Sequence, residues 1–153
     1  DLTVNILTNL AVNKRAITVF GGKQMRPNIH VDDLADLYIQ LLKYPDASIA
    51  GETFNAGYQN HTVEELALLV KKAVEKEMPE KAPIEIQTST SNDMRSYHVS
   101  SKKIAQKLGF VPKRNVEDAV RDICQAFKAG KLPNSLEDDN YFNVKTVKKL
   151  CLV

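Results

Sequence analysis

The sequence has few of the residues and patterns that mark specialised protein classes. Its two cysteines, Cys124 and Cys151, share no spacing typical of a metal site or a redox motif. A disulfide scaffold is therefore not expected, which favours a reducing compartment, with the cytoplasm as the default location. No apolar run is long enough to span a bilayer and no signal-peptide pattern is present, so we expect no membrane association.

Neither basic nor acidic residues are in large excess. The 21 basic and 19 acidic residues leave a formal net charge of +2, which gives no reason to expect nucleic acid or an acidic membrane surface as a partner. Hydrophobic residues make up 43% and charged residues 26% of the chain, as in ordinary globular proteins. A chain of 153 residues can therefore form one domain with a hydrophobic core.

The residues needed for dinucleotide chemistry are missing as well. The six glycines never form a Gly-x-x-Gly-x-x-Gly run, so no Gly-rich turn is present to take up a pyrophosphate on backbone N–H groups. The pairs Tyr38/Lys43 and Tyr97/Lys102 are five residues apart, so neither has the spacing of three or four that an acid/base Tyr and Lys need. The histidines are far apart in the sequence. We expect no catalytic, cofactor-binding or metal-binding residues in this chain.

The most informative stretch is 26–33, which reads Arg-Pro-Asn-Ile-His-Val-Asp-Asp. Alternating polar and apolar residues over 28–31 predict a strand, and Asp32 or Asp33 is suited to cap the helix that follows. Arg26 precedes this strand, and its planar, permanently charged fork of donors suits a phosphate. The alternative is a solvated arginine beside a turn.

The rest of the chain alternates between helical periodicity and short β-branched runs, which predicts an α/β fold of helices with short strands. Residues 131–153 are polar and then mixed, and we expect a solvated tail with a short helix near 143–150. The other expected helices cover 1–13, 33–43, the stretch after a Thr62–Glu65 capping box, 100–108 and 115–127, and the expected strands cover 17–20, 51–57 and 84–87.

Two runs carry a resemblance to a known family: Ile17-Thr-Val-Phe-Gly-Gly and Arg26-Pro-Asn-Ile-His-Val-Asp-Asp-Leu-Ala-Asp. Together they resemble the second half of the NAD-dependent epimerase/dehydratase family, the extended short-chain dehydrogenases that act on nucleotide sugars. The resemblance begins near Asp1 and extends to about Phe127. It implies that residues 1–130 are the C-terminal substrate-binding portion of an extended Rossmann-type dehydrogenase, followed by a C-terminal tail at 131–153.

The resemblance also implies substrate-binding roles. The family's corresponding Arg binds the diphosphate of the sugar nucleotide, which assigns that role to Arg26. The strand before it runs alongside the nucleotide base in the family, so Phe20 is expected against the base, with a buried core Phe as the alternative. Asn28 and Val63 are expected to shape the same pocket.

A second basic group is expected in the loop after residue 88. The family shows an acidic residue and one or more Arg here that contact the ribose and phosphate, and Asp93 matches the acidic position. The family's frequent Arg three residues earlier is replaced by Thr90. Arg95 is expected to supply the missing charge, and an internal Asp93–Arg95 pair is the alternative.

The resemblance implies only the C-terminal half of an enzyme, and a first residue of Asp1 rather than Met agrees with a fragment. NAD or NADP and the catalytic Tyr and Lys are then expected to belong to an N-terminal half. The implied partners are a nucleotide-sugar substrate and, for the full-length protein, a second copy in a homodimer. A non-enzymatic ligand sensor or interaction module of the same superfold stays open, as does a stand-alone α/β binding protein.

Overall fold

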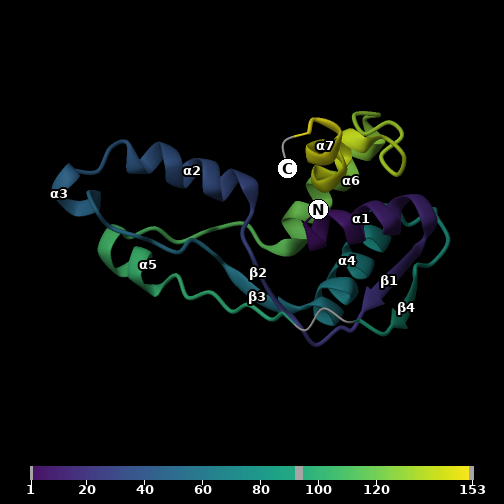
Figure 1. The fold of residues 1–153 in the computed structure, drawn as a ribbon. Helices are drawn as coiled ribbons and strands as arrows, with labels where there is room; N and C mark the ends of the chain where they lie inside the picture. The colour runs from purple at the N-terminus through teal and green to yellow at the C-terminus, as the bar shows by residue number, and fades with distance from the viewer. Residues whose placement is uncertain (1, 92–94, 152–153) are drawn as a thin grey trace.

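The computed structural model describes residues 2–91 and 95–151 and contains helices with short strands (Figure 1). No helix in these two ranges is both long and apolar enough to cross a membrane. In chain order the elements are α1 (Thr3–Lys14), β1 (Ala16–Phe20), β2 (Met25–Asn28), α2 (Val31–Leu41), α3 (Asp46–Ile49), β3 (Gln59–Thr62), α4 (Val63–Glu77), β4 (Glu85–Ser89), α5 (Lys102–Leu108), α6 (Val116–Lys128), the 3-10 turn η1 (Asp139–Tyr141) and α7 (Asn143–Lys149).

The described strands form two separate pairs. β1 and β4 are parallel, with Ile17 opposite Ile86, and the two predicted strands at 17–20 and 84–87 are therefore confirmed. β2 and β3 are antiparallel and place Arg26 opposite His61. The second pair leads directly into α2 and α4, so it fixes where these two helices begin.

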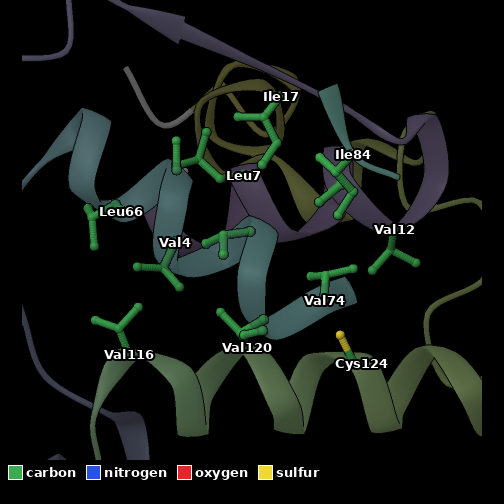
Figure 2. Packing of buried hydrophobic residues seen from close by; sticks show 14 of the residues in the cluster. Val4, Leu7, Val12, Ile17, Leu66, Val74, Ile84, Val116, Val120 and Cys124 are labelled. Carbon is green, nitrogen blue, oxygen red and sulfur yellow. The ribbon is translucent and has the colours of Figure 1, made fainter. Parts of the chain in front are cut away.

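The main hydrophobic core lies between α1, α4, α6 and the β1–β4 pair (Figure 2). On α6, Val116, Val120 and Cys124 recur every four residues, so they share one face of the helix, and all three are buried. Leu66 on α4 is fully buried in the same core. These elements pack as their apolar stripes predict.

A second, smaller cluster lies in an arm built from α2, α3, α5 and the irregular segments between them (Figure 1). Its buried members are Leu37, Ile104, Leu108 and Phe110, and partly buried side chains surround them. Gly109 has a φ of +67° and ends α5, as its position after the helix predicts. The arm therefore has a hydrophobic centre of its own.

The start of α2 differs from the prediction. β2 ends at Asn28 and α2 begins at Val31, so the strand predicted over 28–31 is wrong. The N-cap is His30, whose Nδ1 accepts the Asp32 N–H at 3.2 Å, and neither Asp32 nor Asp33 caps the helix. Ile29 and Val31 do not share a buried face as in a strand, because Ile29 packs on the arm cluster whereas Val31 is 72% exposed.

The strand predicted over 51–57 is also wrong. These residues belong to no strand, and the strand in this part of the chain is β3, which the sequence did not indicate. Within the described residues, no backbone–backbone hydrogen bond involves residues 53–56. A β-branched or aromatic run becomes a strand only when another strand pairs with it, and no described strand lies in that position.

The C-terminal segment is not a solvated tail throughout. Ser135 is 5% exposed, and its Oγ donates to Oδ1 of Asn9 on α1 at 2.7 Å. Nδ2 of Asn9 donates in return to the Ser135 carbonyl at 2.9 Å. These two hydrogen bonds dock the segment on α1, while α7 confirms the short helix expected near residue 143.

The predicted capping box at the start of α4 is confirmed. The Glu65 N–H donates to Thr62 Oγ1 at 3.1 Å, and Glu65 Oε2 accepts the Thr62 N–H at 2.8 Å. The hydrogen bonds from Thr62 lower the pKa of Glu65. The side chains of Thr62 and Glu65 thus accept from backbone N–H groups at the start of α4 that would otherwise lack an acceptor.

We expect Thr62→Ala to lower the free energy of unfolding by about 1 kcal/mol, because it removes the N-cap acceptor of a 15-residue helix that carries much of the core. Urea unfolding followed by circular dichroism measures the change. Thr90→Ala is the matched control, since Thr90 is exposed and lies outside the helices and strands. Equal effects of the two substitutions would contradict the capping role.

Candidate functional site

Arg26 lies in β2 and is held by the chain around it. Its Nη1 donates to the carbonyls of Met25 at 2.9 Å and Arg95 at 2.7 Å. Its Cζ lies 5.5 Å from the centroid of the Tyr97 ring. The guanidinium is only partly buried, so it is oriented by neighbours without being enclosed in the core.

Arg26 and Asn28 line a cavity of about 720 Å³. The walls come from the N-terminal turn of α1, β2 with the start of α2, Tyr58 and Gln59, and the start of α6 with the residues before it. Nδ2 of Asn28 donates to the Arg26 carbonyl at 2.8 Å, which fixes the end of β2 at the cavity wall. The volume lies in the range of small-molecule sites.

A buried carboxylate, that of Asp33, anchors one wall of the cavity. The sequence did not indicate this structural role. Asp33 is 2% exposed and accepts the backbone N–H groups of Lys113 and Arg114 at 3.0 and 2.8 Å. Nη1 of Arg114 donates to Asp33 at 2.6 Å and to Asp36 at 3.1 Å. Hydrogen bonds to Asp36 and Asp33 raise the pKa of Arg114.

His30, Asp32 and Asp122 also meet at this cavity, in a grouping of the type that can bind a cation. His30 Nδ1 accepts a backbone N–H, so a neutral ring carries its hydrogen on Nε2, which faces Asp122 Oδ2 at 3.3 Å. Metal ligation through Nε2 would require the hydrogen on Nδ1 and would disrupt the cap of α2. The donor set therefore fits a hydrogen-bonded structural histidine better than a metal ligand.

The other predicted substrate-binding residues are spread more widely. Phe20 ends β1 with 58% exposure, and it does not belong to the described lining of the cavity. Val63 begins α4 and packs against the main core instead. Arg95 is exposed, and the backbone carbonyl of Arg95 accepts a hydrogen bond from the Arg26 side chain. Asp93 lies outside the described residues.

Comparison with known proteins identifies related sequences. Residues 2–57 match the sequence model of the "NAD dependent epimerase/dehydratase family". UDP-glucose 4-epimerase 2 of Arabidopsis thaliana is 32% identical over 123 residues, a match that covers 74% of this chain and 34% of that protein. The chain thus spans about a third of the length of this relative.

Solved structures share the fold. A UDP-glucose 4-epimerase with UDP-glucose from Thermotoga maritima matches with a TM-score of 0.65 and 23% identity, over 85% of this chain and 40% of that chain. A dTDP-glucose 4,6-dehydratase from Bacillus anthracis in complex with NAD matches with a TM-score of 0.66 and 16% identity, over 90% and 42%. The predicted fold class, an α/β fold with helices and short strands, is confirmed.

Proposed function

Because residues 2–57 of this chain belong to the NAD-dependent epimerase/dehydratase family, as the runs at residues 17–22 and 26–36 predicted, we propose that it is the nucleotide-sugar-binding part of an NAD(P)-dependent nucleotide-sugar epimerase or dehydratase. The proposal gives residues 1–130 to the substrate-binding portion and 131–153 to a C-terminal tail. The proposed boundary falls at Gly130, which has a φ of +66° and follows α6.

The observation that carries the proposal is the placement of Arg26 at the wall of the 720 Å³ cavity. A guanidinium presents donors in a planar fork that matches the oxygens of a diphosphate. In the proposed site Arg26 binds the diphosphate together with Arg95, and Asp93 accepts from the ribose hydroxyls beside them. The hydrogen bond from Arg26 Nη1 to the Arg95 carbonyl holds the 95–97 segment beside this guanidinium.

Three further residues have proposed roles in the binding site. Asn28 lines the cavity beside Arg26 and would shape the pocket around the diphosphate. Phe20, exposed at the end of β1, has an accessible ring for a nucleotide base. Val63 packs against the core, so its proposed contribution is to the shape of the pocket rather than to a direct polar contact.

The cofactor and the catalytic Tyr and Lys are proposed to belong to an N-terminal half. Support comes from residues 53–56, which alternate between exposed and partly buried side chains as a strand does, while no backbone–backbone hydrogen bond involves them within the described ranges. Phe54 and Ala56 already pack on the arm cluster. Strands of a larger sheet, contributed by the N-terminal half, would form the backbone hydrogen bonds that residues 53–56 lack in the described part of the chain.

In such an enzyme this chain binds and orients, and NAD or NADP supplies the hydride chemistry when it is bound. The contacts to the nucleotide and diphosphate are remote from the reacting sugar, and their binding energy holds the sugar in place for reaction. The isolated chain is therefore expected to bind a sugar nucleotide weakly and to show no turnover.

The test is a titration of the 153-residue chain with UDP-glucose, followed by amide NMR shifts. We expect saturable shifts in the millimolar range around Arg26 and Asn28. Arg26→Ala is expected to weaken binding by about 1.5–3 kcal/mol, as for the loss of a charge-assisted hydrogen bond. Arg121→Ala is the control, because Arg121 pairs with Asp118 on the surface of α6 and does not line the cavity.

Two outcomes would overturn this proposal. The first is an absence of saturable shifts in the unsubstituted chain. The second is an affinity for UDP-glucose that Arg26→Ala leaves unchanged. Either result would remove the diphosphate role of Arg26, on which the assignment of the cavity depends.

A further inference from the structure

The segment 95–97 runs along β2 and is attached to it by hydrogen bonds. The Tyr97 N–H donates to the Met25 carbonyl at 3.1 Å, and the Met25 N–H donates to Ser96 Oγ at 3.0 Å. Nη1 of Arg26 donates to the Arg95 carbonyl at 2.7 Å. Three contacts therefore fix this short segment beside the strand that carries Arg26.

This attachment places the Tyr97 ring against the guanidinium of Arg26. The Cζ atom lies 5.5 Å from the ring centroid, within the range at which a cation interacts with an aromatic face. Tyr97 itself is 49% exposed, so the ring contributes little to a hydrophobic core. The cation–π contact of the ring is with the side chain that is proposed to bind the ligand.

A free arginine side chain has many rotamers, and binding a phosphate in one of them has an entropic cost. In this structure the two carbonyl acceptors bind Nη1, and the ring lies near the guanidinium carbon. Together they hold the fork in one orientation before any ligand arrives. Preorganisation of this kind raises affinity without adding a contact to the ligand.

We propose that Tyr97 is a positioning residue, which orients the Arg26 guanidinium toward an anionic diphosphate ligand. The inference rests on the proposed function, because it takes Arg26 as the diphosphate-binding group. It requires the aromatic ring of Tyr97 and not its hydroxyl. Neither residue type nor spacing singled out Tyr97 in the sequence, since the contact depends on how residues 95–97 lie along β2.

The experiment compares Tyr97→Phe with Tyr97→Leu in the 153-residue chain. UDP-glucose and inorganic pyrophosphate are titrated separately, and the Nε–H signal of Arg26 is followed by ¹⁵N relaxation. We expect Tyr97→Leu to weaken binding of both ligands by the same factor, about three- to tenfold, and to increase the mobility of the Arg26 Nε–H. Tyr97→Phe should keep the affinity within about twofold and leave the mobility unchanged, because the ring remains.

Tyr38→Leu is the matched control, because Tyr38 is 60% exposed on α2 and lines no part of the cavity. Loss of affinity for UDP-glucose but not for pyrophosphate would overturn the inference, since the ring would then contact the base or sugar directly. Weaker binding without a change in Arg26 mobility would also overturn it. So would an unchanged affinity in Tyr97→Leu.

The failure of this inference can be distinguished from failure of the proposed function. If the unsubstituted chain binds neither ligand, or if Arg26→Ala binds both as well as the unsubstituted chain does, the diphosphate role of Arg26 is wrong. If Arg26→Ala weakens binding while Tyr97→Leu does not, the diphosphate role stands and only the positioning role of Tyr97 is lost.

Discussion

Asp33→Ala should lower the free energy of unfolding by about 3–5 kcal/mol, because it leaves two backbone N–H groups without an acceptor, at about 1–3 kcal/mol each, and removes one partner of the partly exposed Arg114. The Asp33 carboxylate is 2% exposed and accepts two backbone N–H groups and the guanidinium of Arg114. Its removal leaves the two N–H groups without an acceptor in a space that the smaller side chain does not fill. Denaturant unfolding at neutral pH measures the loss.

The control for Asp33 is Asp36→Ala. Asp36 also accepts from Arg114 Nη1, at 3.1 Å, but its side chain is 50% exposed. Exposed ion pairs contribute little, so we expect a change within about 1 kcal/mol. A loss at Asp36 as large as that at Asp33 would show that burial of the carboxylate is not what makes this anchor strong.

Leu66→Ala should lower the free energy of unfolding by about 2–5 kcal/mol, through lost transfer energy and the cavity that remains. Leu66 is fully buried on α4, between the helices and the β1–β4 pair that surround the main core (Figure 2). Close packing on all sides limits how far the neighbours can relax into the space. Thermal and urea unfolding both measure the effect.

Leu68→Ala, two residues further along the same helix, is the control for Leu66. Its side chain is 56% exposed, so the substitution leaves no internal cavity and keeps a good helix former at the position. We expect a change within about 0.5 kcal/mol. If the two leucines behaved alike, the burial assigned to the inner face of α4 would be incorrect.

Elements with local signals could be predicted from the sequence. The apolar stripe of α6 and the Thr62–Glu65 capping box of α4 each need only a few neighbouring residues, and both are confirmed. Arg26 was found through a short family-like run, and the structure places it beside a cavity. Contacts within about one helical turn are therefore readable from residue types and spacing.

Features that depend on distant parts of the chain could not be predicted. Asp33 was interpreted as a helix cap, yet its partner Arg114 is 81 residues away. His30 was the actual cap, because the geometry of its ring made Nδ1 available to the Asp32 N–H. The position of Tyr97 beside Arg26 likewise depends on the segment 95–97 lying along β2.

The unequal surroundings of the two thiols make the native sequence convenient for spectroscopic labelling. Burial on α6 raises the pKa of the Cys124 thiol to about 11, whereas Cys151 is exposed after α7. Maleimide reagents react with thiolates, and only an accessible sulfur can be reached. One dye or spin label could thus be attached beyond α7 without any engineered substitution, and distances to the ligand cavity could then be measured.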